Sequence, residues 1–255
     1  MIIFFSGTGN SHFVADRLAE LLDEGTPVEL KGEMLYDPMK CRLNGLGEKR
    51  IIWVFPTYSW GVPPAISRFI TEVNFTGVQA INHYMVTTCG DDIGQTADMW
   101  RKLINHRKWV AATAYSVTMP NTYVLMKGFD VDNRELADSK LADAPERIGE
   151  IADRIRNNVE GDLITKGAWP KIKTGIIYPY FKKFCMSPKH FKSNGRCTGC
   201  GKCTRSCPMD NISMENGRPK WHDRCALCLR CYHICPCDAV EYGKATKDKG
   251  QYFLK

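Results

Sequence analysis

Short apolar segments alternate with segments of helical periodicity over the first 160 residues. Strands are expected at residues 1–5 (MIIFF), 50–55 (RIIWVF), 83–88 (HYMVTT) and 109–117 (WVAATAYSV), which are rich in apolar and β-branched residues. Continuous runs of four to eight apolar residues are typical of strands that are buried on both faces. A further short strand is expected near residues 27–30 (PVEL).

The segments between these strands carry the periodicity of helices. Residues 10–22 place Phe13, Val14, Leu18 and Leu22 on one face, as an amphipathic helix requires. Strands that alternate with helices predict a parallel sheet covered on both faces. The other expected helices are residues 65–73, which follow Pro63 and Pro64, residues 93–104 and residues 136–159.

Length and composition indicate a globular protein with its own core. The chain has 255 residues, of which 44% are hydrophobic, so a stable core is possible without disulfides. No apolar stretch approaches the roughly 18 residues of a membrane span. The first residues lead directly into SGTGNS, with no basic segment and no cleavage site, so we expect a cytoplasmic protein. In that compartment, clustered cysteines are more often metal ligands than disulfides.

The charge is distributed unevenly along the chain. Residues 1–165 carry 17 Lys and Arg against 22 Asp and Glu, whereas residues 166–255 carry 18 against 6. Such a step predicts domains with different tasks. A basic region also suits nucleic acid, but the cysteine pattern explains this one more specifically, so no nucleic-acid partner is expected. We predict a first domain at 1–165, a basic and aromatic connector at 166–192 that packs between domains, a cysteine-rich domain at 193–242 and a loosely held tail at 243–255.

The cysteine-rich domain contains one motif twice. Each copy reads C-x2-C-x2-C-x3-C-P, beginning at Cys197 and at Cys225. Three cysteines at this spacing can direct three sulfurs to one Fe4S4 cube, and the proline then turns the chain so that the fourth cysteine serves the other cube. We therefore expect two [4Fe-4S] clusters, one held by Cys197, Cys200, Cys203 and Cys235, and the other by Cys225, Cys228, Cys231 and Cys207.

Zinc is the alternative occupant of these cysteines. Structural zinc sites use two C-x2-C pairs separated by a longer loop, and four cysteines in eleven residues fit that pattern poorly. Residues 193–242 resemble the two-cluster bacterial-type ferredoxins. Cys41, Cys185 and Cys237 lie outside the motif and are interpreted as ordinary thiols.

The segment FSGTGNS lies between the first strand and the first helix. Its glycines allow a tight backbone curl, and a loop at a helix N-terminus forms a phosphate site. The pattern is neither a dinucleotide fingerprint nor a Walker loop, and a plain helix N-cap is the alternative. The hydroxyl-rich loop is similar to the phosphate loop of flavodoxins, which bind FMN. That resemblance covers roughly residues 1–160 and implies phosphate contacts from Ser6, Gly7, Thr8, Gly9, Asn10 and Ser11.

Two further loops follow strands where a flavodoxin-like fold of order 2-1-3-4-5 binds its ligand. The resemblance implies that the loop FPTYSWGVPP flanks the isoalloxazine, with Tyr58 or Trp60 stacking on the ring. It implies that TTCGDDIGQ borders the pyrimidine edge of the ring. The residues concerned are Pro56, Thr57, Tyr58, Ser59, Trp60 and Gly61 in the first loop, and Thr88, Cys89, Gly90 and Asp91 in the second.

The second of these loops lacks the aromatic residue that covers the outer flavin face in many flavodoxins. Either Tyr123, in the long segment 119–135 that also contains Asn121, covers this face, or the face is open to a reactant. Cys89 is interpreted as a redox thiol or as a small residue in a tight loop. Asp91 is interpreted as a ligand of the flavin ring or as a turn residue.

The whole chain resembles the flavodoxin-fused ferredoxin family labelled EFR. SGTGNS, PTYxWGxPP, TCGD, MPNxY and the two cysteine motifs carry this resemblance. It implies an α/β flavodoxin-like doubly wound sheet joined to a small ferredoxin domain, with FMN and two [4Fe-4S] clusters. We expect an electron-transfer protein that converts between one-electron and two-electron steps, with a redox protein as partner. The basic charge of residues 166–255 favours an acidic partner.

The alternative function is that of an FMN-dependent oxidoreductase. It would reduce a small-molecule acceptor with electrons derived from ferredoxin. No nicotinamide fingerprint, nucleophile triad or other catalytic constellation is found in the sequence, so no catalytic residue is assigned.

Overall fold

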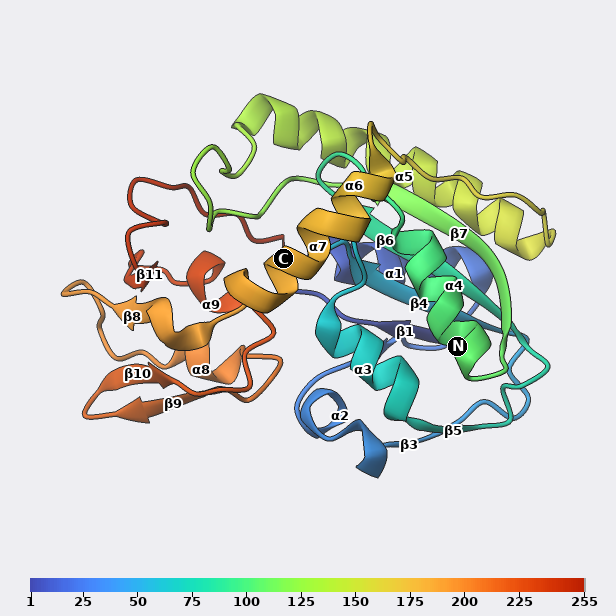
Figure 1. The fold of residues 1–255 in the computed structure, drawn as a ribbon, viewed down its shortest axis with the longest axis horizontal. Coiled ribbons are helices and arrows are strands. Elements are labelled where there is room, and N and C mark those ends of the chain that lie inside the picture. Colours follow the sequence, from blue (N-terminus) through green and yellow to red (C-terminus); the bar gives the residue numbers. More distant parts are fainter. Residues whose placement is uncertain (255) are drawn as a thin grey trace.

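A five-stranded parallel sheet forms the centre of the computed structural model, which describes residues 1–254 (Figure 1). The order across the sheet is β2-β1-β4-β6-β7, which is the flavodoxin-like order 2-1-3-4-5. The predicted fold class is confirmed, including the short strand near residues 27–30. The strands are β1 (Ile2–Phe4), β2 (Val28–Glu29), β4 (Arg50–Pro56), β6 (Asn82–Cys89) and β7 (Val110–Thr118).

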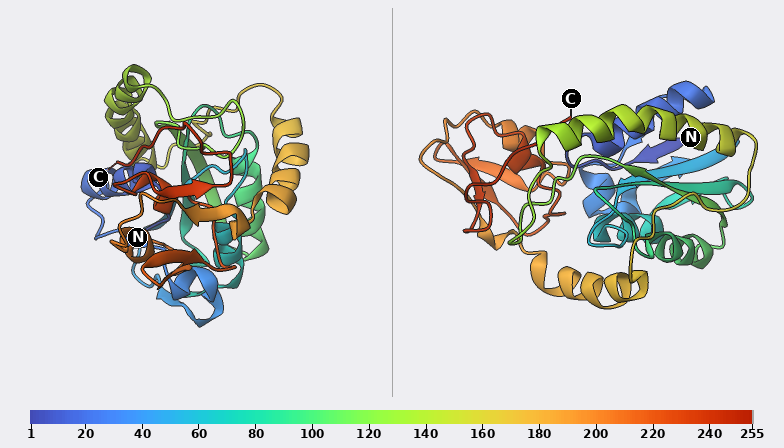
Figure 2. Two further views of the ribbon diagram at one scale, coloured as in Figure 1. Left: turned by 90° about the vertical axis from the view of Figure 1, so that its left-hand side faces the viewer. Right: turned by 90° about the horizontal axis from the view of Figure 1, so that it is seen from above.

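Helices cover both faces of this sheet (Figure 2). On one face, α1 (Asn10–Leu22) packs with α5 (Arg134–Arg156); on the other, α3 (Pro64–Glu72) packs with α4 (Thr96–His106). The side chains of successive β1 residues point to opposite faces of the sheet, because side chains alternate along a strand. Ile2 packs toward α1 and α5, and Ile3 packs toward α3 and α4.

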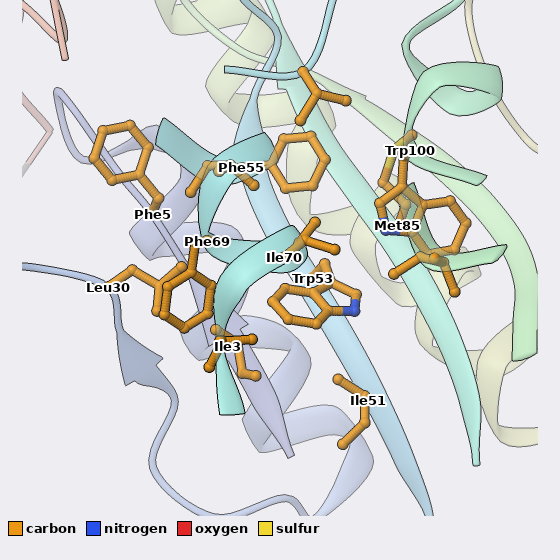
Figure 3. Packing of buried hydrophobic residues seen from close by; sticks show 14 of the residues in the cluster. Ile3, Phe5, Leu30, Ile51, Trp53, Phe55, Phe69, Ile70, Met85 and Trp100 are labelled. Atoms are coloured by element: carbon orange, nitrogen blue, oxygen red, sulfur yellow. The ribbon is translucent and has the colours of Figure 1, made fainter. Parts of the chain in front are cut away.

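The larger hydrophobic cluster lies under α3 and α4 (Figure 3). Trp53 and Met85 contribute from neighbouring strands, Phe69 from α3 and Trp100 from α4, and all four are fully buried. Burying an aromatic side chain of this size removes a large apolar area from water. The continuous apolar runs of the sequence therefore correspond to strands that have no solvent-exposed face.

One polar side chain lies inside this cluster. His83 lies beside Trp53 and stacks on Trp109, with ring centroids 6.1 and 4.9 Å away. Its Nδ1 accepts from the indole N–H of Trp53 at 3.0 Å, and Nε2 lies 3.2 Å from the carbonyl oxygen of Val78. Burial lowers the pKa of His83 to about 4, although the bond to Val78 opposes this shift. The ring is therefore neutral at pH 7, with its proton on Nε2.

Some local structure differs from the sequence-based expectation. The helix expected from residue 93 begins at Thr96, because Gly94 has a φ of +54° and its amide donates to Asp92 Oδ1. The parallel pair β3 (Arg42–Asn44) and β5 (Asn74–Thr76) was not expected, since its exposed polar residues give no strand pattern. Two short helices, α2 (Glu33–Tyr36) and η1 (Pro38–Lys40), precede it.

Residues 170–185 form one continuous helical segment, which we call the connector helix. It consists of α6 (Pro170–Ile172), η2 (Lys173–Ile177), α7 (Tyr178–Tyr180) and η3 (Phe181–Cys185), with η2 and η3 wound as π-helix. The sequence did not predict this helix, because it contains Gly175 and Pro179, and both residue types disfavour helix interiors. The segment contacts both the sheet domain, through Tyr178, and the cysteine-rich part, through Phe181.

The cysteine-rich part is a small two-fold repeat. Its helices α8 (Lys202–Arg205) and α9 (Arg230–His233) are 28 residues apart, as are the two cysteine motifs. Its left-handed backbone positions repeat at the same interval, at Gly199 and Leu227, and at Gly201 and Leu229. Its strand pairs are β8 (Phe191–Ser193) with β11 (Val240–Tyr242), and β9 (Ile212–Glu215) with β10 (Arg218–Trp221), and the short helix η4 (Pro188–His190) precedes β8.

The expectation of a loosely held tail at 243–255 is wrong for the described part of the tail. The amide of Leu254 donates to the carbonyl of Thr8 at 2.9 Å, and the Tyr252 hydroxyl donates to Asn10 Oδ1 at 3.1 Å. Polar composition alone suggested mobility, but these bonds depend on contacts distant in sequence. Over the described residues, the structure has no helix that is both long and apolar enough to cross a membrane.

The buried histidine makes the stability of the fold dependent on pH. Since the folded pKa of His83 is about 4 and the unfolded value is near 6.5, the unfolded chain binds the proton first as pH falls. The free energy of unfolding should decrease by up to about 3 kcal/mol between pH 6.5 and 4 through this residue. Urea denaturation across this range should show a flatter dependence for His83→Gln. The exposed control His106→Gln should retain the dependence of the parent; equal slopes for all three proteins would contradict the assignment.

Candidate cofactor site

A cavity of about 390 Å³ lies at the carboxyl ends of the strands, where ligands bind in open α/β folds. All predicted cofactor residues except Gly9 and Gly61 line it, so the three loops and the segment 119–135 converge on one space. Residues that the sequence did not suggest complete the lining. They are Asp92, Pro120, Thr122, Met126 and Phe129 from the sheet domain, Ile177 and Phe181 from the connector helix, and Leu227, Cys228 and Leu229 from the second cysteine motif.

The two exceptions lie in the predicted loops but adjoin other segments. A Cβ atom on Gly9, whose φ is +99°, would lie 2.0 Å from the carbonyl oxygen of Leu254. A Cβ atom on Gly61 would lie 2.5 Å from the ring of Tyr178. Glycine at these two positions therefore leaves room for the tail and for the connector helix. Neither glycine lines the cavity.

The loop from Ser6 to Ser11 presents unpaired amides at the N-terminus of α1. Gly9 N–H donates to Ser6 Oγ at 3.1 Å, whereas the amides of Gly7, Thr8, Asn10 and Ser11 find no acceptor among the residues described. Helix N-termini with free amides bind anions. The loop is buried and carries no lysine or arginine. Its donor set fits a phosphate group held by amides and hydroxyls.

The loop after β4 directs its two aromatic side chains to different neighbours. Trp60 lines the cavity with Lys173 Nζ 5.0 Å from its ring centroid. The Tyr58 hydroxyl is buried and has no hydrogen-bond partner in the described chain. Burial raises the pKa of Tyr58 well above its usual range, and the nearby Cys228 and Cys225 thiols raise it further. Of the two stacking candidates, Tyr58 thus lies against the cysteine motif.

The loop after β6 is held by contacts with two other segments. Thr88 Oγ1 lies 2.8 Å from Ser11 Oγ. Ser11 belongs to the loop from Ser6 to Ser11, which we call the phosphate loop after its predicted ligand. Lys140 Nζ donates to the Gly90 carbonyl at 2.9 Å and forms an ion pair with Asp132 at 2.7 Å. These bonds fix the loop against α5 and the segment 119–135.

Cys89 is a protonated thiol at neutral pH. Burial raises its pKa to about 12, and the carboxylates of Asp92 and Asp91 contribute to the increase. Since the thiolate is the reactive form of cysteine, this environment favours the interpretation of Cys89 as a small buried residue. Asp91 lines the cavity from an exposed position.

Aromatic residues of the segment 119–135 form one side of the cavity. Tyr123 makes edge-to-face contacts with Phe129 and Phe181, with centroids 5.7 and 6.1 Å apart. Asn121 is held by its amide, which donates to Asp132 at 2.9 Å. The segment is therefore an ordered wall that joins the sheet domain to the connector helix.

The cysteines of the first predicted ligand set line a second, smaller cavity. Cys197, Cys200, Cys203 and Cys235 surround it, together with the apolar residues Met214 and Val240. Cys237 also borders this space. Its counterpart in the first motif, 28 residues earlier, is Met209, so the repeat does not make Cys237 a ligand. The four predicted cysteines fit a group that four thiolates hold from different sides.

The cysteines of the second set are close neighbours under the main cavity. Burial raises the pKa of Cys231 well above its usual range, and Cys228, Cys225 and Cys207 raise it further through their charges. No group of three or more His, Cys, Asp or Glu side chains in residues 1–254 converges enough to hold a single metal ion. The donor chemistry of each set, four cysteines from the repeated motif, fits a cluster of several irons.

Backbone amides donate to the cysteine sulfurs at equivalent positions of the repeat. Asn211 N–H points to Cys207 Sγ at 3.4 Å, and Ala239 N–H points to Cys235 Sγ at 3.2 Å. Leu227 N–H lies 3.3 Å from Cys225 Sγ. Hydrogen bonds to sulfur tune the potential of a bound cluster.

Arg230 joins the second cysteine motif to the phosphate loop. Its guanidinium donates to the carbonyls of Ser6 and Gly7 at 2.8 and 2.9 Å and to that of Ser206 at 3.2 Å. It also lies 3.3 Å from Glu29. The fork geometry of arginine permits these simultaneous bonds. One side chain therefore fixes the position of this motif relative to the cavity.

Comparison with known proteins identifies the cysteine-rich part. Residues 189–236 match the family model described as "4Fe-4S dicluster domain". The chain therefore contains a C-terminal dicluster ferredoxin domain. The matched range includes all eight predicted ligand cysteines. Comparison with curated protein sequences gave no significant match.

Several solved structures are similar to the sheet domain. A short-chain flavodoxin associated with a bacterial microcompartment is 14% identical, with a TM-score of 0.38, and the match covers 62% of this chain and 97% of that one. General stress protein 14 of Treponema denticola, solved with FMN, is 12% identical, with a TM-score of 0.38 and coverages of 62% and 95%. An azoreductase of Bacillus anthracis is 11% identical, with a TM-score of 0.36 and coverages of 60% and 98%. The strand order, rather than these likenesses, defines the fold.

The bonds of Arg230 predict a stability effect at the junction. Arg230→Lys retains the charge but removes the fork, and it should lower the free energy of unfolding by about 1 to 3 kcal/mol. The exposed Arg205, in the first copy of the repeat, provides the control Arg205→Lys. Urea denaturation of the full chain measures both. If the two variants were equally stable, the junction would not depend on Arg230.

The unpaired hydroxyl of Tyr58 predicts a redox effect. Because it lies against Cys225 and Cys228, we expect it to donate to a sulfur of the group held there, and Tyr58→Phe should lower the midpoint potential of that group. A hydrogen bond of about 1 kcal/mol corresponds to about 40 mV for a one-electron couple. EPR-monitored redox titration measures the shift. Tyr115→Phe, which removes another buried hydroxyl without a partner among residues 1–254, should leave the potential unchanged.

Proposed function

We propose that the chain is an iron–sulfur flavoprotein that transfers electrons between two [4Fe-4S] clusters and FMN. The observation that carries this proposal is the position of Cys228, which lines the cavity together with the phosphate loop and Trp60. A predicted cluster ligand and the predicted flavin loops thus share one space. Clusters exchange single electrons, whereas a flavin exchanges one or two, so this arrangement supports conversion between the two modes.

The two cysteine sets have different positions relative to the cavity. Cys207, Cys225, Cys228 and Cys231 would hold the proximal cluster, since Cys228 borders the cavity. Cys197, Cys200, Cys203 and Cys235 would hold the distal cluster, and Cys200 is exposed. The distal set is therefore the side from which a redox partner can exchange electrons. The exposed Lys202 and Arg205 beside Cys200 favour an acidic partner.

The phosphate loop and the aromatic walls would hold the FMN. The free amides of Gly7, Thr8, Asn10 and Ser11 would bind its phosphate. Trp60 and Tyr123 line the same cavity and would contact the ring. A volume of about 390 Å³ lies in the range of cofactor pockets. These features support the flavin assignment.

Reduction of a small-molecule acceptor is the second candidate function. Met126 and Phe129 line the cavity and are 45% and 39% exposed. Apolar side chains at the rim of a cavity favour contact with a small molecule. Oxidation of the reduced protein by a panel of small acceptors, compared with oxidation by acidic redox proteins, distinguishes the two functions.

Cofactor analysis tests the main proposal. Protein purified without oxygen should contain about eight irons, about eight sulfides and one FMN per chain. Cys235→Ala should lower the iron content by about half and slow the reduction of the flavin by an external donor, because Cys235 belongs to the distal set.

The matched control is Cys237→Ala, which alters the same small cavity at a position outside the motif. Its iron content and flavin reduction should equal those of the parent. Zinc in place of iron, or the absence of flavin, would contradict the corresponding half of the proposal. Unchanged iron and flavin reduction in Cys235→Ala would contradict the assignment of the distal cluster.

A further inference from the structure

The connector helix has an inner row of residues that attach it to the rest of the protein. Thr174 Oγ1 donates to the Trp60 carbonyl at 2.7 Å, and the Tyr178 hydroxyl donates to the Val62 carbonyl at 2.5 Å. Phe181 is buried in the hydrophobic cluster of the cysteine-rich part. These residues follow one another at helical spacing, so one face of the helix is fully used by internal contacts.

The opposite face of the same helix is apolar and exposed. Ile172, Ile176, Tyr180 and Phe184 recur every four residues and are 48%, 66%, 59% and 60% exposed, and Trp169 before the first turn is 76% exposed. Six of the thirteen large hydrophobic residues that are exposed in the described chain lie between residues 169 and 184. The clustering marks an interaction surface, because scattered exposed residues are normal but rows of them are not. We call Trp169, Ile172, Ile176, Tyr180 and Phe184 the outer row.

Positive charge accompanies the outer row. Residues 166–192 contain seven lysines and neither Asp nor Glu. Lys171, Lys182 and Lys183 are exposed beside the row, and Lys183 Nζ lies 5.1 Å from the ring centroid of Phe184. Of these seven lysines, only Lys173 and Lys192 form ion pairs within the described chain. The others are available to an anionic surface.

We propose that the outer row docks the protein on an anionic lipid surface, with the connector helix lying in the plane of the headgroups. A helix with Trp, Ile, Tyr and Phe on one face and lysines beside them has the composition of an interfacial membrane helix. Lysine is depleted at protein–protein interfaces but is attracted to anionic leaflets, so the lysines favour lipid over a protein partner. The helix runs along the outside of the molecule, where a flat surface can reach it (Figure 2).

The docked orientation places the main cavity beside the lipid. Ile177 and Phe181 line the cavity from the inner side of the same helix. The thickness of one helix therefore separates the cavity from the docking face. An electron donor or acceptor dissolved in the lipid would reach the protein on this side.

Vesicle binding tests the proposal with the full, cofactor-loaded chain. Co-flotation with vesicles of phosphatidylcholine plus phosphatidylglycerol should be strong, and co-flotation with phosphatidylcholine alone should be weak. Substituting Ile176→Ser, Tyr180→Ser and Phe184→Ser together should reduce binding about tenfold or more, a large change in binding free energy. The control Met39→Ser, Leu46→Ser and Val159→Ser removes three exposed apolar side chains elsewhere and should bind as the parent does.

Two double variants with equal changes in net charge test the contribution of the lysines to vesicle binding. Lys182→Glu with Lys183→Glu should reduce binding, whereas the equal charge change Lys49→Glu with Lys247→Glu should have a smaller effect. Circular dichroism confirms that each variant folds. Absence of binding to anionic vesicles, or equal binding by the triple variant and its control, overturns the proposal. A dimer in solution that the triple variant converts to monomer also overturns it, because a second copy would then cover the outer row.

Discussion

The close contact between the second cysteine motif and the phosphate loop is the interaction on which the arrangement of the site depends. The backbone of Gly7 approaches Cys228 so closely that a Cβ atom would lie 2.6 Å from the Cys228 carbonyl oxygen. Arg230, two residues further, binds the carbonyls of Ser6 and Gly7. The loop thus keeps its amides free for an anion while its carbonyls hold the cysteine-rich part. Opposite sides of one short segment therefore face the cavity and the cysteine-rich part.

This contact explains why the two halves of the repeat differ although their backbones agree. The first copy uses Gly199 and Gly201 at left-handed positions, where the second copy uses Leu227 and Leu229. A left-handed conformation costs a non-glycine residue roughly 1–2 kcal/mol. Both leucines are 4% exposed, and both line the main cavity, so burial of their side chains offsets that cost. The two halves of the repeat therefore share the spacing of their cysteines but differ in their contacts with the sheet domain.

The sequence predicted the parts of the structure that depend on local pattern. Parallel strands that are buried on both faces are rich in apolar residues. Cysteines at a fixed spacing predict the ligation of iron–sulfur clusters without knowledge of the fold. The sequence did not predict the connector helix, because Gly175 and Pro179 interrupt its helical pattern. It did not assign Tyr58 to the cysteine side, since two aromatics two residues apart give no indication of which one faces which neighbour. The contributions of Leu227, Leu229 and the tail to the site arise from contacts between segments more than 200 residues apart.

Several attachments hold the cysteine-rich part at the end of the sheet, and three of them come from three different segments. Arg230 binds the phosphate loop, and His233 lies 2.8 Å from the Thr122 carbonyl through Nε2 and accepts the Tyr252 amide through Nδ1. Phe181 supplies the third from the connector helix. A constellation of groups works only when the supporting structure fixes it closely, and one attachment would leave a hinge. Three attachments around the cavity remove rotation as well as translation. The separation between the cavity and the proximal cysteines is therefore a property of the fold and does not depend on the flexibility of a linker.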